Sequence, residues 1–186
     1  LPIMVETPYI LTIWLKIVPE HTIWFVRLIL LYALFDSISR PLITAMLATG
    51  NIRKYQLIIG GIQLLCLPAS YIFLREGFLP EITLIVALAL NICCLIIRLI
   101  LLRSMIGLKA RDYIKNVVLK VCLVGVIASI LPIYLSLSLS NNFLSFIIVT
   151  GITLIMSLVV IYNIGCSASE KKIIKSFILK LFHKLI

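Results

Sequence analysis

Long apolar runs alternate with short polar clusters along the chain. A helix needs about 20 predominantly apolar residues to cross a hydrocarbon layer of roughly 30 Å. Runs of this kind are typical of transmembrane helices. The pattern predicts five spans, over residues 21–47, 57–74, 82–102, 117–139 and 143–164.

Composition points to an all-α, polytopic transmembrane helical bundle. Hydrophobic residues make up 62% of the 186 residues and charged residues 13%, with a mean hydropathy of +1.21. These values exclude a chain made mainly of amphipathic surface helices. The residues before 21 include Tyr9 and Trp14, which suit a membrane interface, so we expect the end of a truncated span there. Residues 1–164 would then form one transmembrane lobe. Because the chain starts at Leu1 without Met, we expect a C-terminal piece of a longer protein.

The basic residues between the predicted spans indicate the orientation. If the chain zigzags through the spans, eleven of them fall on one side, whereas the other side has only Lys16 and Arg75 and collects four glutamates. The positive-inside rule makes the basic side cytoplasmic and places the C-terminus inside. The scatter of these residues over three segments argues against a nucleic-acid partner. The eleven residues are Arg53, Lys54, Arg103, Lys109, Arg111, Lys115, Lys171, Lys172, Lys175, Lys180 and Lys184.

Residues 165–186 predict a basic amphipathic helix at the C-terminus. Ser167 and Glu170 have the spacing of a capping box at a helix start. Apolar residues then recur at helical spacing, with lysines on the other face. Such a helix would lie on the anionic inner leaflet of the membrane. A helix that binds a soluble partner is the alternative.

Three ionisable residues, Arg27, Asp36 and Arg40, lie inside the first predicted span. A charge at the bilayer centre costs at least ~2.5 kcal/mol, so such groups usually face a bundle interior or a wet cavity. Asp36 and Arg40 are four residues apart and share a helix face. Two interpretations stay open. The two residues form an ion pair that only neutralises their charges. Alternatively, Arg40 presents a cation to an anionic substrate, with Ser37 and Thr44 on neighbouring turns. Asp36 is also the candidate for ion coupling. Arg27 lies about 140° round the helix from Arg40, so one cavity wall need not contain both.

Polar side chains also recur at steps of seven in the second and third spans. They are Gln56, Gln63 and Ser70 in the second span, and Asn91 and Arg98 in the third. Interhelical hydrogen bonds are favoured over a solute path as the reason for such stripes, including a mild one of Thr150, Thr153 and Ser157 in the fifth span. Gln63 and Asn91 are nevertheless candidates for substrate contact. Arg98 is expected to extend its charged end to the membrane surface.

Two prolines and a glycine predict local changes in the helices. Pro41 removes a backbone donor and loosens the first span one turn below Asp36. Pro68 predicts a kink in the second span. Gly50 stops the first span.

No arrangement of residues indicates catalysis, a metal site or a cofactor. The two histidines, His21 and His183, lie at a span boundary and in the tail. The five cysteines have no metal-ligand spacing, and we expect packing residues without disulfides. The sequence therefore predicts a protein that is not an enzyme.

Three features lead to a family resemblance. They are a Trp-Leu-x-x-x-Pro step at Trp14 to Pro19, a span ending "LATGNIRKYQ" and the following "LPASYIFLREGFLPE". On these features, residues 6–81 resemble the C-terminal half of bacterial polysaccharide flippases, the Wzx or O-antigen-transporter group in the superfamily that also holds the MATE multidrug exporters. The later residues resemble this group only in helix count and charge placement.

The resemblance implies two pseudo-symmetric lobes, of which this chain would be most of the second, with the N-terminal lobe as its missing partner. It implies transport of an undecaprenyl-pyrophosphate-linked oligosaccharide across the bacterial inner membrane by alternating access, driven by a cation gradient. Arg40 and Arg27 would suit the pyrophosphate by physical analogy. A MATE-like cation-coupled small-molecule exporter remains an alternative, although such an exporter would need an unpaired carboxylate inside the membrane. A membrane-embedded enzyme of polysaccharide synthesis also stays open.

Overall fold

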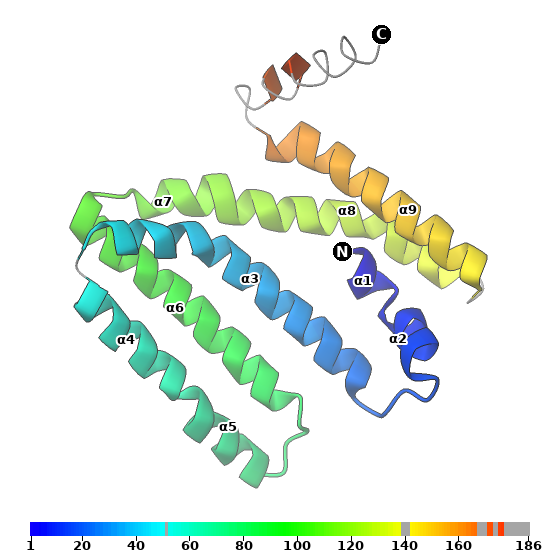
Figure 1. Cartoon of the computed structure of the whole chain (residues 1–186), viewed down its shortest axis with the longest axis horizontal. Coiled ribbons are helices and arrows are strands. Elements are labelled where there is room, and N and C mark those ends of the chain that lie inside the picture. The colour runs from blue at the N-terminus through cyan, green and yellow to red at the C-terminus, as the bar shows by residue number, and fades with distance from the viewer. Residues whose placement is uncertain (51, 139–141, 167–170, 173–174, 177–186) are drawn as a thin grey trace. The chain divides into compact units, whose positions relative to one another are not determined.

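The structure is a computed structural model that describes residues 1–50, 52–138, 142–166, 171–172 and 175–176 (Figure 1). All the regular secondary structure in these ranges is helical. The chain divides into two compact units, one of residues 10–117 and one of residues 1–9 with 118–186.

Helix α6 is the central element of the unit of residues 10–117. It packs against α3 along one side and against α4 and α5 along another, as Figure 1 shows. The bounds of these helices are α3 Thr22–Ala48, α4 Ile52–Leu64, α5 Cys66–Arg75 and α6 Ile82–Ile106. Most of α2 (Thr7–Leu15) and the short α7 (Ala110–Tyr113) belong to the same unit.

Buried apolar side chains follow one face of α3 and one face of α6. On α3 they are Ile38, Leu42 and Met46, at steps of four. On α6 most of them, from Cys94 to Leu102, lie one, three or four residues apart. Spacing of this kind places each set on one side of its helix. The α6 set is Val86, Cys94, Leu95, Leu99 and Leu102.

The unit of residues 1–9 and 118–186 is built on two long helices, α8 (Leu119–Ser138) and α9 (Phe143–Val160), which pack against each other. The short α1 (Pro2–Val5) contacts both. Near it, the rings of Tyr9 and Phe146 lie 5.3 Å apart between centroids. Two π-helical turns, η1 (Ile114–Val118) and η2 (Ile161–Gly165), precede α8 and follow α9.

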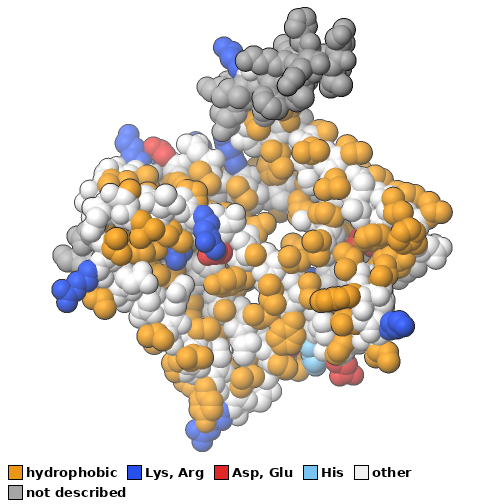
Figure 2. Space-filling model, in the orientation of Figure 1, with side chains coloured by type: hydrophobic (Ala, Val, Ile, Leu, Met, Phe, Trp, Pro, Cys, Tyr) orange, Lys and Arg blue, Asp and Glu red, His pale blue; other side chains and the backbone are white. Residues whose placement is uncertain are grey.

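Five helical stretches in the described residues are long and apolar enough to cross a membrane, which confirms the predicted fold class. Only 6–33% of the residues in their most apolar windows are buried. Large apolar side chains are therefore exposed on the helices, and they cover much of the face in Figure 2. Such a surface suits lipid, so the chain is a multi-pass membrane protein. The stretches are Thr22–Ala48, Tyr55–Arg75, Ile82–Ile106, Ala110–Ser136 and Phe143–Gly165.

The predicted bounds of the spans lie close to these stretches except around the third connection, and the predicted end of the fourth span at residue 139 lies outside the described residues. There the helices reach Ile106 and resume at Ala110, whereas the prediction ended one span at 102 and began the next at 117. Most charged residues of this region are arginines and lysines, which are good helix formers, so the helices continue beyond the apolar runs. Gly107, at φ 68° in the left-handed region, ends α6.

The two prolines have different effects. Helix α3 continues through Pro41 without a break. In the second span the helix is interrupted at Leu65, between α4 and α5. Pro68 donates no hydrogen bond to the carbonyl group of Leu64, and its ring crowds that carbonyl, which accounts for a break at this place.

Most of the predicted tail helix lies outside the described residues. This holds for the capping box at residues 167–170 and for residues 173–174 and 177–186. Lys171, which is described, donates a hydrogen bond from Nζ to the carbonyl oxygen of Asn163 over 3.0 Å. The same ammonium group lies 5.5 Å from the centre of the Tyr162 ring.

Candidate functional site

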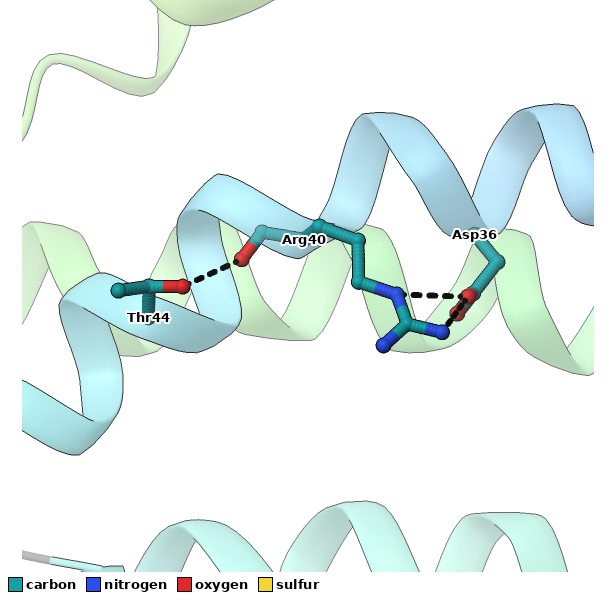
Figure 3. Close-up of polar contacts among 3 residues, drawn as sticks. All are labelled: Asp36, Arg40 and Thr44. Atoms are coloured by element: carbon teal, nitrogen blue, oxygen red, sulfur yellow. Dashed lines mark hydrogen bonds and ion pairs between the residues drawn. The ribbon is translucent and has the colours of Figure 1, made fainter.

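Asp36 and Arg40 form an ion pair on one face of α3 (Figure 3). The Nε and Nη2 atoms of Arg40 donate hydrogen bonds to Oδ2 of Asp36 over 2.9 and 2.7 Å. The Arg40 side chain is 73% exposed and that of Asp36 is 26% exposed. The remaining guanidinium nitrogen points away from Asp36 (Figure 3). The pair thus neutralises both charges and still leaves Arg40 open to an incoming anion.

The neighbouring turns contribute one further hydroxyl contact. Thr44 donates a hydrogen bond from Oγ1 to the carbonyl oxygen of Arg40 over 3.2 Å. Ser37 is exposed. Because Pro41 has no N–H group, the Ser37 carbonyl lacks its usual helical donor. This turn of α3 therefore carries an exposed cation, a hydroxyl and a backbone acceptor.

Arg27 does not join this group of residues. It is 13 positions before Arg40, which corresponds to about 20 Å along the axis of α3. Its guanidinium carbon lies 5.8 Å from the centre of the Trp24 ring, and its Nε atom is buried with no hydrogen-bond partner among the described residues. Arg27 and Arg40 therefore lie at different levels along the helix and do not form one site.

A second set of polar residues lines a pocket between α3, the α4–α5 stretch and α6. The pocket has a volume of about 210 Å³ and brings together Gln63 and Asn91, the two candidates from the second and third spans. Asn91 is buried, and its Nδ2 atom has no hydrogen-bond partner in the part of the chain that the structure describes. A buried amide donor without an acceptor is costly, so this pocket favours a polar occupant. Its lining is Tyr32, Gln63, Cys66, Ala87, Leu90 and Asn91.

Helix α3 connects the pocket to the ion pair. Tyr32, Asp36 and Arg40 follow at steps of four residues, which keeps neighbours on one slowly turning face. Tyr32 lines the pocket, and Arg40 lies about 12 Å further along the axis. We call these three residues, with Gln63 and Asn91, the polar track. Sequence spacing predicted four of its members and missed Tyr32, because a tyrosine in an apolar run also suits lipid contact.

Arg98 lies where the sequence analysis did not place it. It was expected to extend toward the membrane surface, and this prediction is wrong, because the residue is only 3% exposed. Its Nε atom donates a hydrogen bond to the hydroxyl oxygen of Tyr55 over 3.2 Å. Its Nη1 atom is buried and has no partner within the described ranges. Helix α6 extends to Ile106, so Arg98 is more than two turns from its end and lies on the packed face.

The prediction of interhelical hydrogen bonds is wrong for two members of the stripe in α9. Thr153 donates a hydrogen bond to the carbonyl oxygen of Val149, and Ser157 donates one to that of Thr153. Both bonds stay within the helix, because these short hydroxyl side chains reach the carbonyl four residues earlier. The hydroxyl oxygen of Thr150 is buried, and no described residue gives it a hydrogen-bond partner.

The described residues contain no group of three or more His, Cys, Asp or Glu side chains that could hold a metal ion. The five cysteines are all free. Comparison with family models, with curated proteins and with solved structures gives no match. Fold and site together define a multi-pass helical membrane protein with a polar track that runs from a pocket between helices to an exposed face of α3.

Proposed function

We propose that the chain is the C-terminal lobe of a flippase in the bacterial inner membrane. It would move an undecaprenyl-pyrophosphate-linked oligosaccharide to the outer leaflet for surface polysaccharide export. The N-terminal lobe of the same protein is the partner that completes the transport path, and the C-terminus is cytoplasmic. The resemblance of residues 6–81 to the Wzx group suggested this class, and no enzymatic step is part of the proposal.

The observation that supports this function best is the open arrangement of Arg40. It lies inside the span Thr22–Ala48, yet its side chain is 73% exposed rather than packed against the other helices. An exposed cation at this depth is costly against lipid, so this face of α3 favours a wet cavity. A guanidinium group binds phosphate oxygens with two hydrogen bonds, which suits a pyrophosphate.

The ion pair supplies a physical link between substrate and a coupling cation. A pyrophosphate that binds Arg40 competes with Asp36 for the Nε and Nη2 donors that Asp36 now holds. Asp36 would then be an unpaired carboxylate inside a span, a state that favours uptake of a proton or a small cation. Substrate binding and cation uptake would therefore depend on each other, as alternating access requires.

The amide groups of the pocket suit the uncharged part of the same substrate. Gln63 and Asn91 offer donors and acceptors, and Tyr32 offers a ring and a hydroxyl group. Sugar hydroxyls are both donors and acceptors, so they can satisfy the unpaired Nδ2 atom of Asn91.

Deletion of the complete gene tests the function as a whole. The expected result is loss of surface polysaccharide and accumulation of undecaprenyl-linked repeat units on the cytoplasmic side of the membrane. Unchanged polysaccharide with greater sensitivity to cationic dyes would favour a MATE-like exporter instead. Loss of glycan elongation would favour an enzyme.

Variants of the ion pair test the role of Arg40. Arg40→Ala should lower export about tenfold or more at equal expression, because one charge-assisted contact to phosphate is lost. Arg40→Lys should retain part of the activity, since the charge stays but the bidentate geometry is lost. Arg103→Ala, an exposed arginine in the last turn of α6, is the matched control and should export normally. Equal export by Arg40→Ala and this control would refute the role of Arg40.

A further inference from the structure

An apolar groove lies at the end of the helix pair where α3 and α6 begin. It has a volume of about 440 Å³ and is open on one side. Its walls come from the first turns of α3, the connection between α5 and α6 and the first turn of α6. The lining residues are Trp24, Leu28, Phe78, Leu79, Glu81, Ile82 and Ile85.

Only one of the two carboxylate oxygens of Glu81, the acidic residue in this lining, has a hydrogen-bond partner among the described residues. Glu81 is 8% exposed, and its Oε1 atom lies 2.5 Å from Nδ1 of His21. Its other oxygen, Oε2, is buried and has no hydrogen-bond partner among the described residues. A buried carboxylate oxygen without a donor is costly. The Glu81 side chain therefore favours a ligand with a positively charged donor.

A basic side chain lies next to Trp24, although it is not itself part of the lining. The Arg27 guanidinium carbon is 5.8 Å from the centre of the Trp24 ring, and its buried Nε donor has no hydrogen-bond partner among the described residues. Glu81 is the residue immediately before α6, whereas Arg27 is more than one turn inside α3. The basic group thus lies deeper in its span than the acidic group.

The position of the groove indicates an amphiphilic occupant. The spans begin at Thr22 and Ile82, so the groove lies at the level where a membrane helix leaves the hydrocarbon. Trp24 and Phe78 supply the aromatic rings that are common at this level. Further along α3 and α6, Leu28 and Ile85 continue the apolar wall toward the membrane interior. An occupant would therefore place its head at Glu81 and its tail along this wall.

We propose that this groove binds an aminophospholipid of the surrounding bilayer, of the phosphatidylethanolamine type. The primary ammonium group donates to Glu81, the phosphate faces Arg27 and one acyl chain lies against Leu28 and Ile85. In such a lipid the phosphate is nearer the acyl chains than the ammonium, which matches the depths of the two side chains. The terminal torsion of a glutamate has a broad energy well, so a small rotation turns Oε2 toward the groove.

A lipophilic amine shares the chemistry of an ammonium head on an apolar tail. The membrane lipid is favoured because Arg27, next to the Trp24 wall of the groove, supplies a positive charge as well, whereas a simple amine uses only Glu81. This inference concerns binding alone and does not depend on the proposed transport function.

Native mass spectrometry of the full-length protein in detergent tests the site. Dioleoyl phosphatidylethanolamine, dioleoyl phosphatidylglycerol and dodecylamine are added in turn. The wild-type protein should retain the ethanolamine lipid about tenfold better than the glycerol lipid, the effect of one charge-assisted hydrogen bond. Glu81→Gln should abolish this preference. Glu20→Gln, which removes an exposed carboxylate next to His21, is the matched control and should keep it.

A second variant tests the apolar wall without changing a charge. Ile85→Trp places a larger side chain in the groove and should lower retention of both lipids. Equal retention of the two lipids by the wild-type protein would overturn the proposal, and this comparison needs no variant. Loss of the preference in Glu20→Gln as well would also overturn it, since the effect would then come from net charge. Stronger retention of dodecylamine than of the ethanolamine lipid would overturn the assignment to a membrane lipid.

Discussion

Tyr55→Phe tests whether Arg98 is held as a buried cation by a single neutral partner. The Tyr55 hydroxyl accepts from Nε of Arg98 over 3.2 Å, and the two residues are 5% and 3% exposed. The variant leaves the guanidinium with a second unpaired donor beside Nη1. Leaving a buried donor at a charged group unsatisfied costs about 1–3 kcal/mol. We expect the free energy of unfolding to fall by this amount.

Reversible unfolding of the full-length protein in mixed micelles measures the effect. Tyr71→Phe is the matched control, because Tyr71 is on α5 and is 66% exposed. The control should change the free energy of unfolding by less than about 0.5 kcal/mol. A similarly small change in Tyr55→Phe would refute the account of the buried hydrogen bond.

A double-mutant cycle then separates the hydrogen bond from the buried charge. Arg98→Met removes the charge and leaves the Tyr55 hydroxyl without its donor. The double variant, Tyr55→Phe with Arg98→Met, replaces both partners by apolar groups. Such replacements are often neutral or stabilising, so the double variant should be more stable than the sum of the single effects predicts. Additive losses would mean that Arg98 has no significant coupling to Tyr55.

Two further predictions use residue pairs that differ in one physical respect. In variants that keep a single cysteine, a small polar thiol reagent should modify Cys66 at least about tenfold faster than Cys94. Cys66 lines the polar pocket, whereas Cys94 is fully buried. Equal rates of modification would contradict the pocket. Gly107→Ala should lower the free energy of unfolding by about 1–2 kcal/mol, because Gly107 has φ 68°. Gly125→Ala in α8 should raise the free energy of unfolding by about 0.5–1 kcal/mol. An added Cβ meets no atom within 4 Å at either glycine, so the two sites differ in backbone conformation and not in space. A loss of equal size at both sites would contradict this explanation.

The fold class and the spans could be predicted from the sequence because membrane insertion depends on local composition. The free energy of transferring a segment into hydrocarbon is close to a sum over its own residues. The last residue of the third span and the first residue of the fourth span were predicted less well. Helix α6 passes through Arg103 and ends at Gly107, so its end is set by backbone conformation and not by the edge of the apolar run.

The ion pair of the candidate site could also be predicted, because both partners are on one helix. A separation of four residues brings Asp36 and Arg40 together whatever the other helices do. Its exposure could not be predicted in this way. Whether this face of α3 packs or stays open depends on where α6 lies, and the buried residues Ile38 and Leu42 show which side packs.

What the sequence by itself determined is the set of membrane-spanning helices, the separation of charges and the contact between Asp36 and Arg40 within α3. Only the tertiary structure decided that Gln63 and Asn91 share a pocket, that Arg98 turns inward to Tyr55 and that Glu81 meets His21. The physical reason is that contacts between helices depend on how far each helix is rotated about its axis. In lipid no difference in hydrophobicity fixes that rotation, and side-chain packing between neighbouring helices fixes it instead.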